Sequence, residues 1–215
     1  MNPSVPSHSR LPAEQRRQNL IETAIELFSR KGFSGTTTKE IAAAAGVTEA
    51  IVFRHFATKK DLYTAILQHR LKDANIEAWL RRAETLMAQG DDEGLFRFLI
   101  SQIIEQFREE PRFERLVLFA ALEGQELAVM HNQIAAPIAS KFLEYIVQRQ
   151  QVGAIRQGDP GVILLACAGI AKFYAAQKYI YRICEPQTSD DVVVDQILSI
   201  VMQGLRGERA KESER

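Results

Sequence analysis

The stretch Thr36-Thr-Thr-Lys-Glu-Ile-Ala-Ala-Ala-Ala-Gly-Val-Thr48 carries the strongest structural signal in the chain. Thr37 followed three residues later by Glu40 is a capping box, which predicts a short alanine-rich helix over residues 38–45. Gly46 ends that helix, and Thr48 can cap another one that runs to about His55. Two short helices joined by a tight turn form the helix-turn-helix pattern.

A helix-turn-helix has a geometry that can read DNA. Its second helix can lie in the major groove with its N-terminal residues at base edges, while backbone amides at helix starts meet phosphates. The small residues Ala42 to Ala45 would let the two helices approach closely. An ordinary helical hairpin in a bundle has the same spacing, so the spacing alone leaves both interpretations open.

The segments on either side also show helical rather than alternating periodicity, which predicts an all-α protein. Upstream, a helix is expected from near Pro12 to Gly32. Downstream, Thr58 with Asp61 repeats the capping pattern and opens a fourth, longer helix. Beyond residue 75 the expected helices become longer and more apolar, as a domain with its own core requires. The breakers that divide them are Gly90-Asp91-Asp92, Pro111 and Asp159-Pro160, and Pro137 predicts a kink.

The composition is that of a soluble, folded protein, with 215 residues of which 46% are hydrophobic and 25% charged. The net charge is zero but unevenly spread. Residues 1–70 hold ten basic and six acidic side chains, whereas residues 71–215 hold 17 basic and 21 acidic ones. A basic first third suits a DNA-facing end, and an acidic remainder suits a different role.

The sequence predicts a cytoplasmic location. The longest apolar run, Gly161 to Ala171, is shorter than the ~20 apolar residues that a membrane-spanning helix needs. The N-terminus lacks the apolar core of a secretory signal. Cys167 and Cys184 lack the paired spacing of a zinc or redox site, and we expect both to be reduced thiols.

The residues around the helix-turn-helix resemble the DNA-binding domain of the TetR family of repressors. The resemblance covers about residues 14–74 and includes the glycines, the apolar framework and the end of the recognition helix. The segments that carry it are Phe28-Ser-Arg-Lys-Gly-Phe33, Thr36-Thr-Thr-Lys-Glu-Ile-Ala42, Ala45-Gly-Val-Thr48, Phe53-Arg-His-Phe56 and Lys59-Lys-Asp-Leu62.

This resemblance implies a domain organisation and a function. Residues 1–13 would form a flexible arm, residues 14–74 a TetR-type helix-turn-helix DNA-binding domain, and residues 75–215 a larger helical domain for effector binding and dimerisation. The implied protein is a homodimeric transcriptional repressor that uses no cofactor. It would bind a double-stranded DNA operator and leave it when a hydrophobic small-molecule inducer enters the C-terminal domain.

The resemblance also assigns roles to residues at the helix starts. Thr38 would contact a phosphate, and Thr48 would combine capping with a phosphate or base contact. Lys59, in the first turn of the fourth helix, would contact the DNA backbone. Glu49 departs from a position that is commonly basic in the family. Its carboxylate either reads a base or simply favours the start of the helix.

The remaining DNA-facing candidates lie along the recognition helix. Ala50, Ile51 and Arg54 occupy positions where the family reads bases or backbone. Phe53 stands where the family usually has tyrosine, so it either lacks a hydroxyl contact to phosphate or serves as a packed aromatic. His55 resembles a phosphate-contacting histidine, with packing as the alternative role.

A ligand pocket is expected between the segment Leu95 to Phe119 and the segment around His131 to Tyr145. Its walls would be mostly apolar with few polar groups, as small-molecule sites are. Core packing is the alternative for each residue taken singly. The candidate lining residues are Phe96, Phe113, Phe119, His131 and Tyr145, with Gln133 as a second polar candidate.

A dimer interface is expected on two segments, Val162 to Ile180 and Val192 to Leu205, because both are apolar on more than one face. Burial within one chain is the alternative. The residues expected at this interface are Leu164, Leu165, Ala168, Phe173, Ala175, Ala176, Ile197, Ile200 and Val201.

No catalytic pattern stands out, so we expect no enzymatic activity. Gly153 and Gly158 have the spacing of a phosphate loop, but Asp159-Pro160 stands where a lysine and a hydroxyl residue belong. Glu123, Glu126 and His131 could meet around a metal, although solvated surface residues are the commoner outcome. The competing function is a helical adaptor that keeps the fold without specific DNA binding, and Glu49 and Phe53 favour it.

Overall fold

The computed structural model describes residues 12–73, 76–183 and 188–206, and every regular element in them is helical. The N-terminal part consists of α1 (Ala13–Lys31), α2 (Thr38–Ala44), α3 (Glu49–His55) and α4 (Lys59–Asp73). The C-terminal part consists of α5 (Ile76–Gln89), α6 (Asp92–Glu109), α7 (Pro111–Glu123), α8 (Gln125–Gln151), α9 (Pro160–Ala175), the π-helical turn η1 (Ala176–Tyr181) and α10 (Asp190–Leu205). The prediction of an all-α fold is confirmed.

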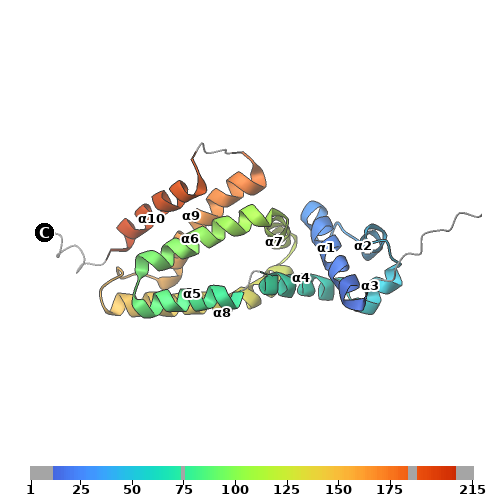
Figure 1. The fold of residues 1–215 in the computed structure, drawn as a ribbon, viewed down its shortest axis with the longest axis horizontal. Helices are drawn as coiled ribbons and strands as arrows, with labels where there is room; N and C mark the ends of the chain where they lie inside the picture. Colours follow the sequence, from blue (N-terminus) through green and yellow to red (C-terminus); the bar gives the residue numbers. More distant parts are fainter. Residues whose placement is uncertain (1–11, 74–75, 184–187, 207–215) are drawn as a thin grey trace, which may run out of the picture.

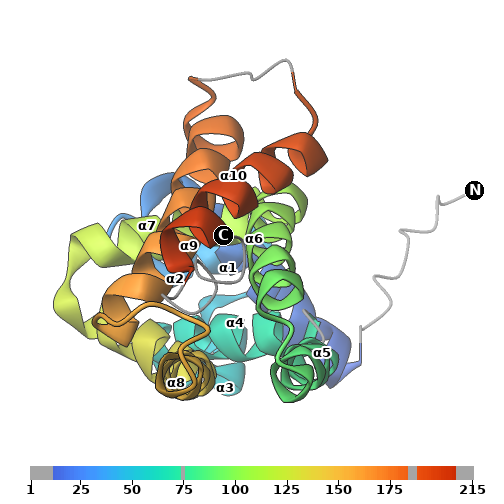
Figure 2. The same ribbon diagram turned by 90° about the vertical axis from the view of Figure 1, so that its left-hand side faces the viewer.

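The helices α1, α2 and α3 form a head at one end of an elongated molecule, and α4 leads from it toward the rest (Figure 1). The body, α5 to α10, has α6 at its centre, packed against α9 and α10. Seen end-on, α5 and α8 run along one side of the body, while α6, α9 and α10 lie on the other (Figure 2). Pro137 lies inside α8, which continues through it as one helix.

The capping boxes form as the sequence predicts. The Thr37 hydroxyl accepts the Glu40 amide at 3.1 Å, and Glu40 accepts the Thr37 amide at 2.8 Å. Thr58 and Asp61 repeat this reciprocal pair at the start of α4. Thr48 occupies the N-cap position of α3 as predicted, but its side chain accepts no capping hydrogen bond. Its carbonyl instead accepts the Ile51 amide at 2.9 Å, which closes the first turn through the backbone.

The helix α7 belongs to the hydrophobic core of the head although it follows the head by more than fifty residues. Phe113, Leu116 and Ala120 are buried with Phe28, Ile41 and Tyr63 in one cluster of apolar side chains. The pairing of α1 with α7 is among the most extensive helix contacts in the molecule. Residues 14–74 therefore do not enclose their core alone, since α7 closes one side of it.

Within the described residues, one helical stretch, Pro160–Tyr181, is long and apolar enough to cross a membrane when judged by length and composition alone. It contains the run Gly161 to Ala171, which the sequence interpretation takes as too short for a span. In this structure the stretch covers α9 and η1 and packs against α6 and α10. A single stretch of this kind is weak evidence for a membrane span, because core helices of water-soluble proteins have the same composition.

Truncating the buried face of α7 should destabilise the protein. Leu116→Ala removes a side chain that is 2% exposed, and the expected loss is ~2–5 kcal/mol of unfolding free energy from lost burial and the resulting cavity. Leu122→Ala makes the same change at an 86% exposed position of the same helix and should alter stability by less than ~0.5 kcal/mol. Urea unfolding followed by circular dichroism measures both, and equal effects would contradict the burial argument.

Candidate DNA-binding face and ligand cavity

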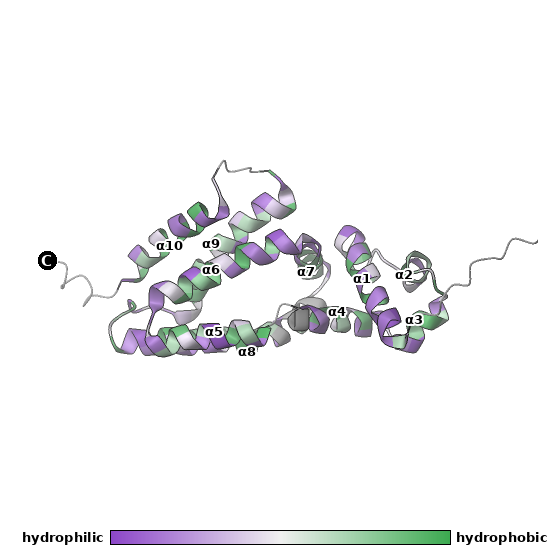
Figure 3. Cartoon of the chain, in the orientation of Figure 1, coloured by the Kyte–Doolittle hydropathy of each residue, from purple (hydrophilic) through white to green (hydrophobic). Residues whose placement is uncertain are grey.

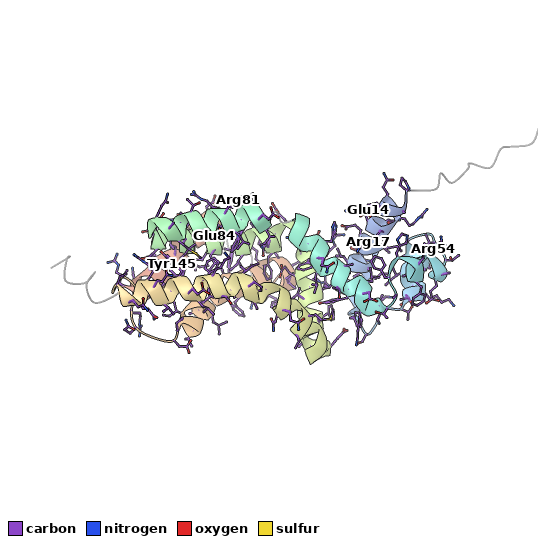
Figure 4. The ribbon with its side chains drawn as sticks, turned by 90° about the horizontal axis from the view of Figure 1, so that it is seen from below. Glu14, Arg17, Arg54, Arg81, Glu84 and Tyr145 are labelled. Atoms are coloured by element: carbon purple, nitrogen blue, oxygen red, sulfur yellow. The ribbon has the colours of Figure 1, made fainter. Side chains whose placement is uncertain are left out.

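The helix α3 presents one exposed face. Ala50, Phe53 and Arg54 are exposed and lie three and four residues apart, so they share one side of the helix. Val52 points the other way and is buried in the head core. Arg54 lies on the head, at the end of the molecule away from the body (Figure 4). This face has the position and exposure that a groove-reading helix needs.

The turn that presents α3 depends on a glycine. Gly46 has a φ of +67°, a left-handed conformation that L side chains rarely adopt. Around it, the Val47 amide donates to the Ala42 carbonyl at 2.9 Å, and the Ala45 amide donates to the Ile41 carbonyl at the same distance. These bonds end α2 and turn the chain directly into α3.

Two of the predicted DNA contacts bind each other. The Thr38 hydroxyl donates to a carboxylate oxygen of Glu49 at 2.5 Å, joining the first turn of α2 to the first turn of α3. The sequence interpretation weighs base reading against helix capping for Glu49 and does not include this bridge. Whatever Glu49 does toward DNA, its carboxylate also fixes the relative position of the two short helices.

Lys59 faces the loop between α1 and α2. Its ammonium donates to the carbonyls of Phe33 at 2.8 Å and Thr36 at 2.9 Å, and it lies 4.2 Å from the centre of the Phe33 ring. Burial lowers the pKa of this lysine. These contacts tie the start of α4 to the loop that leads into α2. The phosphate contact of Lys59 stays a prediction.

The other predicted DNA contacts differ in how exposed their side chains are. Thr48 is exposed, whereas Ile51 and His55 are half-buried. The His55 ring lies 6.3 Å from the ring of Phe56, which is itself buried in the head core beneath the guanidinium of Arg17. His55 thus has a packing contact within the head, and its contact with phosphate stays a prediction.

The last residue of α7 reaches the head. The Glu123 carboxylate accepts the Ser34 amide at 3.0 Å, in the loop between α1 and α2. This approach requires a glycine at position 32, because a Cβ there would lie 1.8 Å from a Glu123 oxygen. The sequence left open a metal site formed by Glu123, Glu126 and His131. The side chains of Glu126 and His131 lie outside the described residues. Among the residues that are described, no group of three potential metal ligands occurs.

The other end of α7 also contacts α1. Arg112 makes two hydrogen bonds to Glu110, at 2.7 and 2.8 Å, and its guanidinium lies 3.5 Å from Glu26 and 3.8 Å from Glu22 of α1. The hydrogen bonds to Arg112 lower the pKa of Glu110. Both ends of α7 thus carry polar contacts that flank its buried apolar face.

A cavity of about 510 Å³ lies between α4 and the body helices and is partly open to solvent, and its volume is within the ~300–1,000 Å³ typical of small-molecule sites. Its walls come from α4, α5, α6, α7, α8 and α9. Most of them are apolar, and the charged residues on them are Arg70, Glu114 and Lys172. Burial raises the pKa of the Glu114 carboxyl, and Lys172 and Arg70 act in the opposite direction.

Of the predicted lining residues whose side chains the structure describes, only Phe113 lies on the cavity wall. Phe96 is buried in the core, and Phe119 is half-buried without lining the cavity. Tyr145 is buried too, and its hydroxyl donates to Asp92 at 2.6 Å. Gln133 is exposed, and the side chain of His131 lies outside the described residues.

Sequence reasoning missed most of the cavity wall, above all Trp79, Phe142, Arg70, Glu114 and Lys172. Helical periodicity shows which side chains point inward, but it does not distinguish those that pack tightly from those that border a cavity. Lys172 interrupts an apolar helix with alanines at positions 168, 175 and 176, but its side chain is exposed, so the sequence pattern gave no sign that it borders a cavity.

The segments expected at a dimer interface divide into two groups. Leu165, Phe173 and Ile200 are exposed, at 71%, 64% and 63%, on helices where apolar residues are frequent (Figure 3), and Leu165 also lies on the rim of the cavity. The other candidates have partners in the same chain. Leu164 and Ala168 line the cavity, whereas Ala175, Ala176, Ile197 and Val201 are buried in the body core. Cys167 is buried in that core as well, and Cys184 lies outside the described residues.

Comparisons with known proteins match the head. Residues 20–66 match the sequence model of the family described as bacterial regulatory proteins, tetR family. The chain is similar to the HTH-type transcriptional regulator AcrR of Shigella flexneri, with 34% identity over 100 residues, 46% of this chain and 45% of AcrR. It is also similar to the HTH-type transcriptional activator FasR of Mycolicibacterium smegmatis, with 29% identity, 51% of this chain and 48% of FasR. The matches therefore span about half the length of these relatives.

The fold of the whole chain is similar to solved structures. The transcriptional regulator FadR from Bacillus subtilis, solved in complex with stearoyl-CoA, matches 87% of this chain and 98% of its own, with a TM-score of 0.67. The sequence identity is 15%, so this likeness concerns the fold. It extends from the head through the body.

Removing the Lys59 ammonium should loosen the head. Lys59→Met keeps much of the apolar stem but removes two charge-assisted hydrogen bonds, and we expect a loss of roughly 1–3 kcal/mol of unfolding free energy. Lys39→Met, on the exposed surface of α2, is the matched control and should change stability little. Denaturant unfolding measures both, and an unchanged midpoint for Lys59→Met would show that these bonds do not hold the loop.

Proposed function

We propose that this chain, whose residues 20–66 match the tetR family model, is a TetR-type transcriptional repressor that leaves its operator when a small molecule occupies the cavity. The observation that carries this proposal is the placement of α7. Its first turn supplies Phe113 and Glu114 to the cavity wall, and its last residue holds the Ser34 amide of the head. One rigid helix thus touches both the candidate effector site and the candidate DNA-binding head.

The DNA-binding part of the proposal rests on the exposed face of α3 and on the positive charge of Arg54. The exposed face of α3 carries Arg54 and has the small residue Ala50 beside it, which allows close approach to base edges. The relatives AcrR and FasR are named as transcriptional regulators, and one of them as an activator.

Ligand release requires that the cavity and the head be coupled. A molecule that displaces Phe113, or Arg70 on α4, shifts the two helices that lead into the head. Because Glu123 lies at the far end of α7, such a shift changes the hydrogen bond that its carboxylate accepts from Ser34 in the loop before α2. Couplings between two binding sites are typically ~1–3 kcal/mol, enough for a several-fold change in operator affinity.

We further propose a homodimer that forms through α9 and α10. Leu165, Phe173 and Ile200 expose large apolar side chains on neighbouring helices, and apolar patches of this kind mark protein interfaces. A two-fold dimer would place two copies of α3 on two operator half-sites. The same partner would cover much of the apolar stretch Pro160–Tyr181, in keeping with a cytoplasmic protein.

A helical adaptor without specific DNA binding is the second candidate. Phe53 favours it, because this exposed aromatic offers no hydroxyl to a phosphate. A gel shift of the protein with DNA from upstream of its own gene, at increasing salt, distinguishes the two functions. Operator binding must weaken steeply as salt rises, since it releases counterions from phosphates. No shift at low salt would leave the adaptor as the better description.

Arg54→Ala should weaken binding to all DNA sequences about equally and make the salt dependence shallower by roughly one charge, as expected for a lost phosphate contact. The measurement is fluorescence anisotropy with operator and random duplexes at several salt concentrations. Arg81→Ala, on the body helix α5, removes the same kind of charge far from α3 and should leave both affinities unchanged (Figure 4). A loss confined to the operator would identify Arg54 as a base contact instead.

Glu49→Gln should strengthen binding to random DNA, because a carboxylate that lies near phosphates repels them. The amide oxygen can still accept the Thr38 hydroxyl, so the bridge between α2 and α3 is retained. Discrimination at one base position should fall, typically by ~1–3 kcal/mol for a lost direct contact. Glu14→Gln is the control, since it removes another first-turn acid on the head. Unchanged affinity for both duplexes would leave only the structural roles of Glu49.

Phe173→Glu should convert the protein to a monomer at micromolar concentration, because the substitution places a charge in the proposed interface and Phe173 does not line the cavity. Leu122→Glu changes an exposed leucine of α7 and should leave the dimer intact. Sedimentation velocity measures the oligomeric state. A wild-type monomer, or a dimer that tolerates Phe173→Glu, would rule out this interface.

A further inference from the structure

The cavity has a charged end. Arg70 of α4, Glu114 of α7 and Lys172 of α9 all line it, and both cations act electrostatically on the Glu114 carboxyl. The Arg70 guanidinium also lies 5.8 Å from the centre of the Phe113 ring. In the part of the chain that the structure describes, none of these three side chains has an ion-pair partner. Three charged groups thus border one cavity without neutralising one another in close pairs.

Apart from Gln102 and Gln106, the rest of the wall is apolar and aromatic. The Trp79 and Phe142 rings lie 5.7 Å apart, and Leu99, Ile138 and Leu143 continue the surface. On α9, Lys172 and Gly161 both line the cavity and are eleven residues apart, which corresponds to roughly 16 Å along a helix. The cavity is therefore elongated, with charges beside α4 and α7 and hydrocarbon walls beyond.

We infer that the cavity takes an amphiphile with one anionic end, of which a medium-chain carboxylate is the simplest example. Its charged group lies between Arg70 and Lys172, and its hydrocarbon body lies against Trp79 and Phe142. This inference rests on the proposed function only in treating the cavity as a ligand site. Arg70 supplies planar, bidentate recognition of a carboxylate, and Lys172 adds a second positive charge.

The balance of charge favours an anion over a cation. Two cations and one carboxyl leave the charged end net positive even when Glu114 is ionised. Burial favours the neutral form of Glu114, and this makes the charged end more positive still. A ligand ammonium could pair with Glu114 but would meet Arg70 and Lys172 beside it. A cationic amphiphile is therefore the class that would overturn the inference.

The chain contains a single tryptophan, Trp79, and it lies on the cavity wall, so its fluorescence reports occupancy directly. Decanoate, decylammonium and decanol share one chain length and differ in the charge of the end group. Titrated into the full-length protein, decanoate should change Trp79 emission saturably and bind at least tenfold more tightly than decanol. Decylammonium should bind more weakly than decanol.

Equal affinity for the three molecules would overturn the inference, and so would a preference for decylammonium. If none of them changes Trp79 emission, the cavity does not take amphiphiles and the inference fails. None of these outcomes concerns DNA, because operator binding is measured separately by gel shift. A chain that binds decanoate but no operator would refute the proposed function and keep this inference.

Substitutions locate the charged end. Arg70→Gln should reduce decanoate affinity about tenfold, the lower range for a lost hydrogen bond to a charged group, and should leave decanol unaffected. Lys141→Gln is the control, since this lysine of α8 pairs with Glu84 and does not line the cavity. A similar loss of decanoate affinity in both variants would show a general effect of protein charge and no specific carboxylate site at Arg70.

The pH dependence has a definite sign. Among the described residues, the titratable groups on the cavity wall are Arg70, Glu114 and Lys172, and burial raises the pKa of Glu114 while the two cations oppose that shift. A bound carboxylate raises the pKa of Glu114 further, so binding takes up a proton and decanoate affinity increases as the pH falls through the range in which Glu114 titrates. Glu114→Gln should abolish this trend and bind decanoate at least as well at pH 8. The opposite slope would indicate that Glu114 pairs with a cation.

Discussion

The apolar face of α7 is the contact on which the arrangement of this molecule depends. Phe113, Leu116 and Ala120 complete the core of the head, although the chain reaches them only after two helices of the body. Buried apolar area of this kind is the dominant stabilising term in folding. The head therefore cannot keep its core intact and also move freely against α7. Any movement of α7 at the cavity must be accommodated by the helices of the head.

Polar contacts then set the fine geometry of the head. The Thr37–Glu40 capping box starts α2, the Thr38–Glu49 bond joins α2 to α3, and Lys59 holds the loop before them. The Lys31 ammonium and the Thr37 backbone amide lower the pKa of Glu40 to about 2, so this cap stays ionised at neutral pH. Several residues expected to face DNA thus also shape the surface that presents α3. Substituting them changes both geometry and contact, and this is why matched variants are needed.

The fold and the helix-turn-helix were predictable from the sequence because they follow from local chemistry. Caps, glycines and helical periodicity lie within a few residues of the structure they determine, as Thr37, Gly46 and Thr58 illustrate. The cavity was not predictable in this way. Arg70, Glu114 and Lys172 come together from three helices, and only the packing of those helices makes them neighbours. The same holds for Glu123, whose contact with Ser34 spans 89 residues of sequence. The aromatic residues Phe96 and Tyr145 were expected at the ligand and instead fill the core, because periodicity identifies inward faces without showing where the packing is incomplete.

Hydrogen exchange at the Ser34 amide tests the coupling through α7 most directly, because this N–H donates to Glu123. If α7 couples the cavity to the head, this amide exchanges slowly in the free protein and faster once decanoate, or another molecule that changes Trp79 emission, occupies the cavity. In Glu123→Ala the Ser34 amide should exchange fast with or without ligand. Exchange at Ser34 that stays unchanged while Trp79 reports an occupied cavity would contradict the account, since the head would then be insensitive to the site that is proposed to control it.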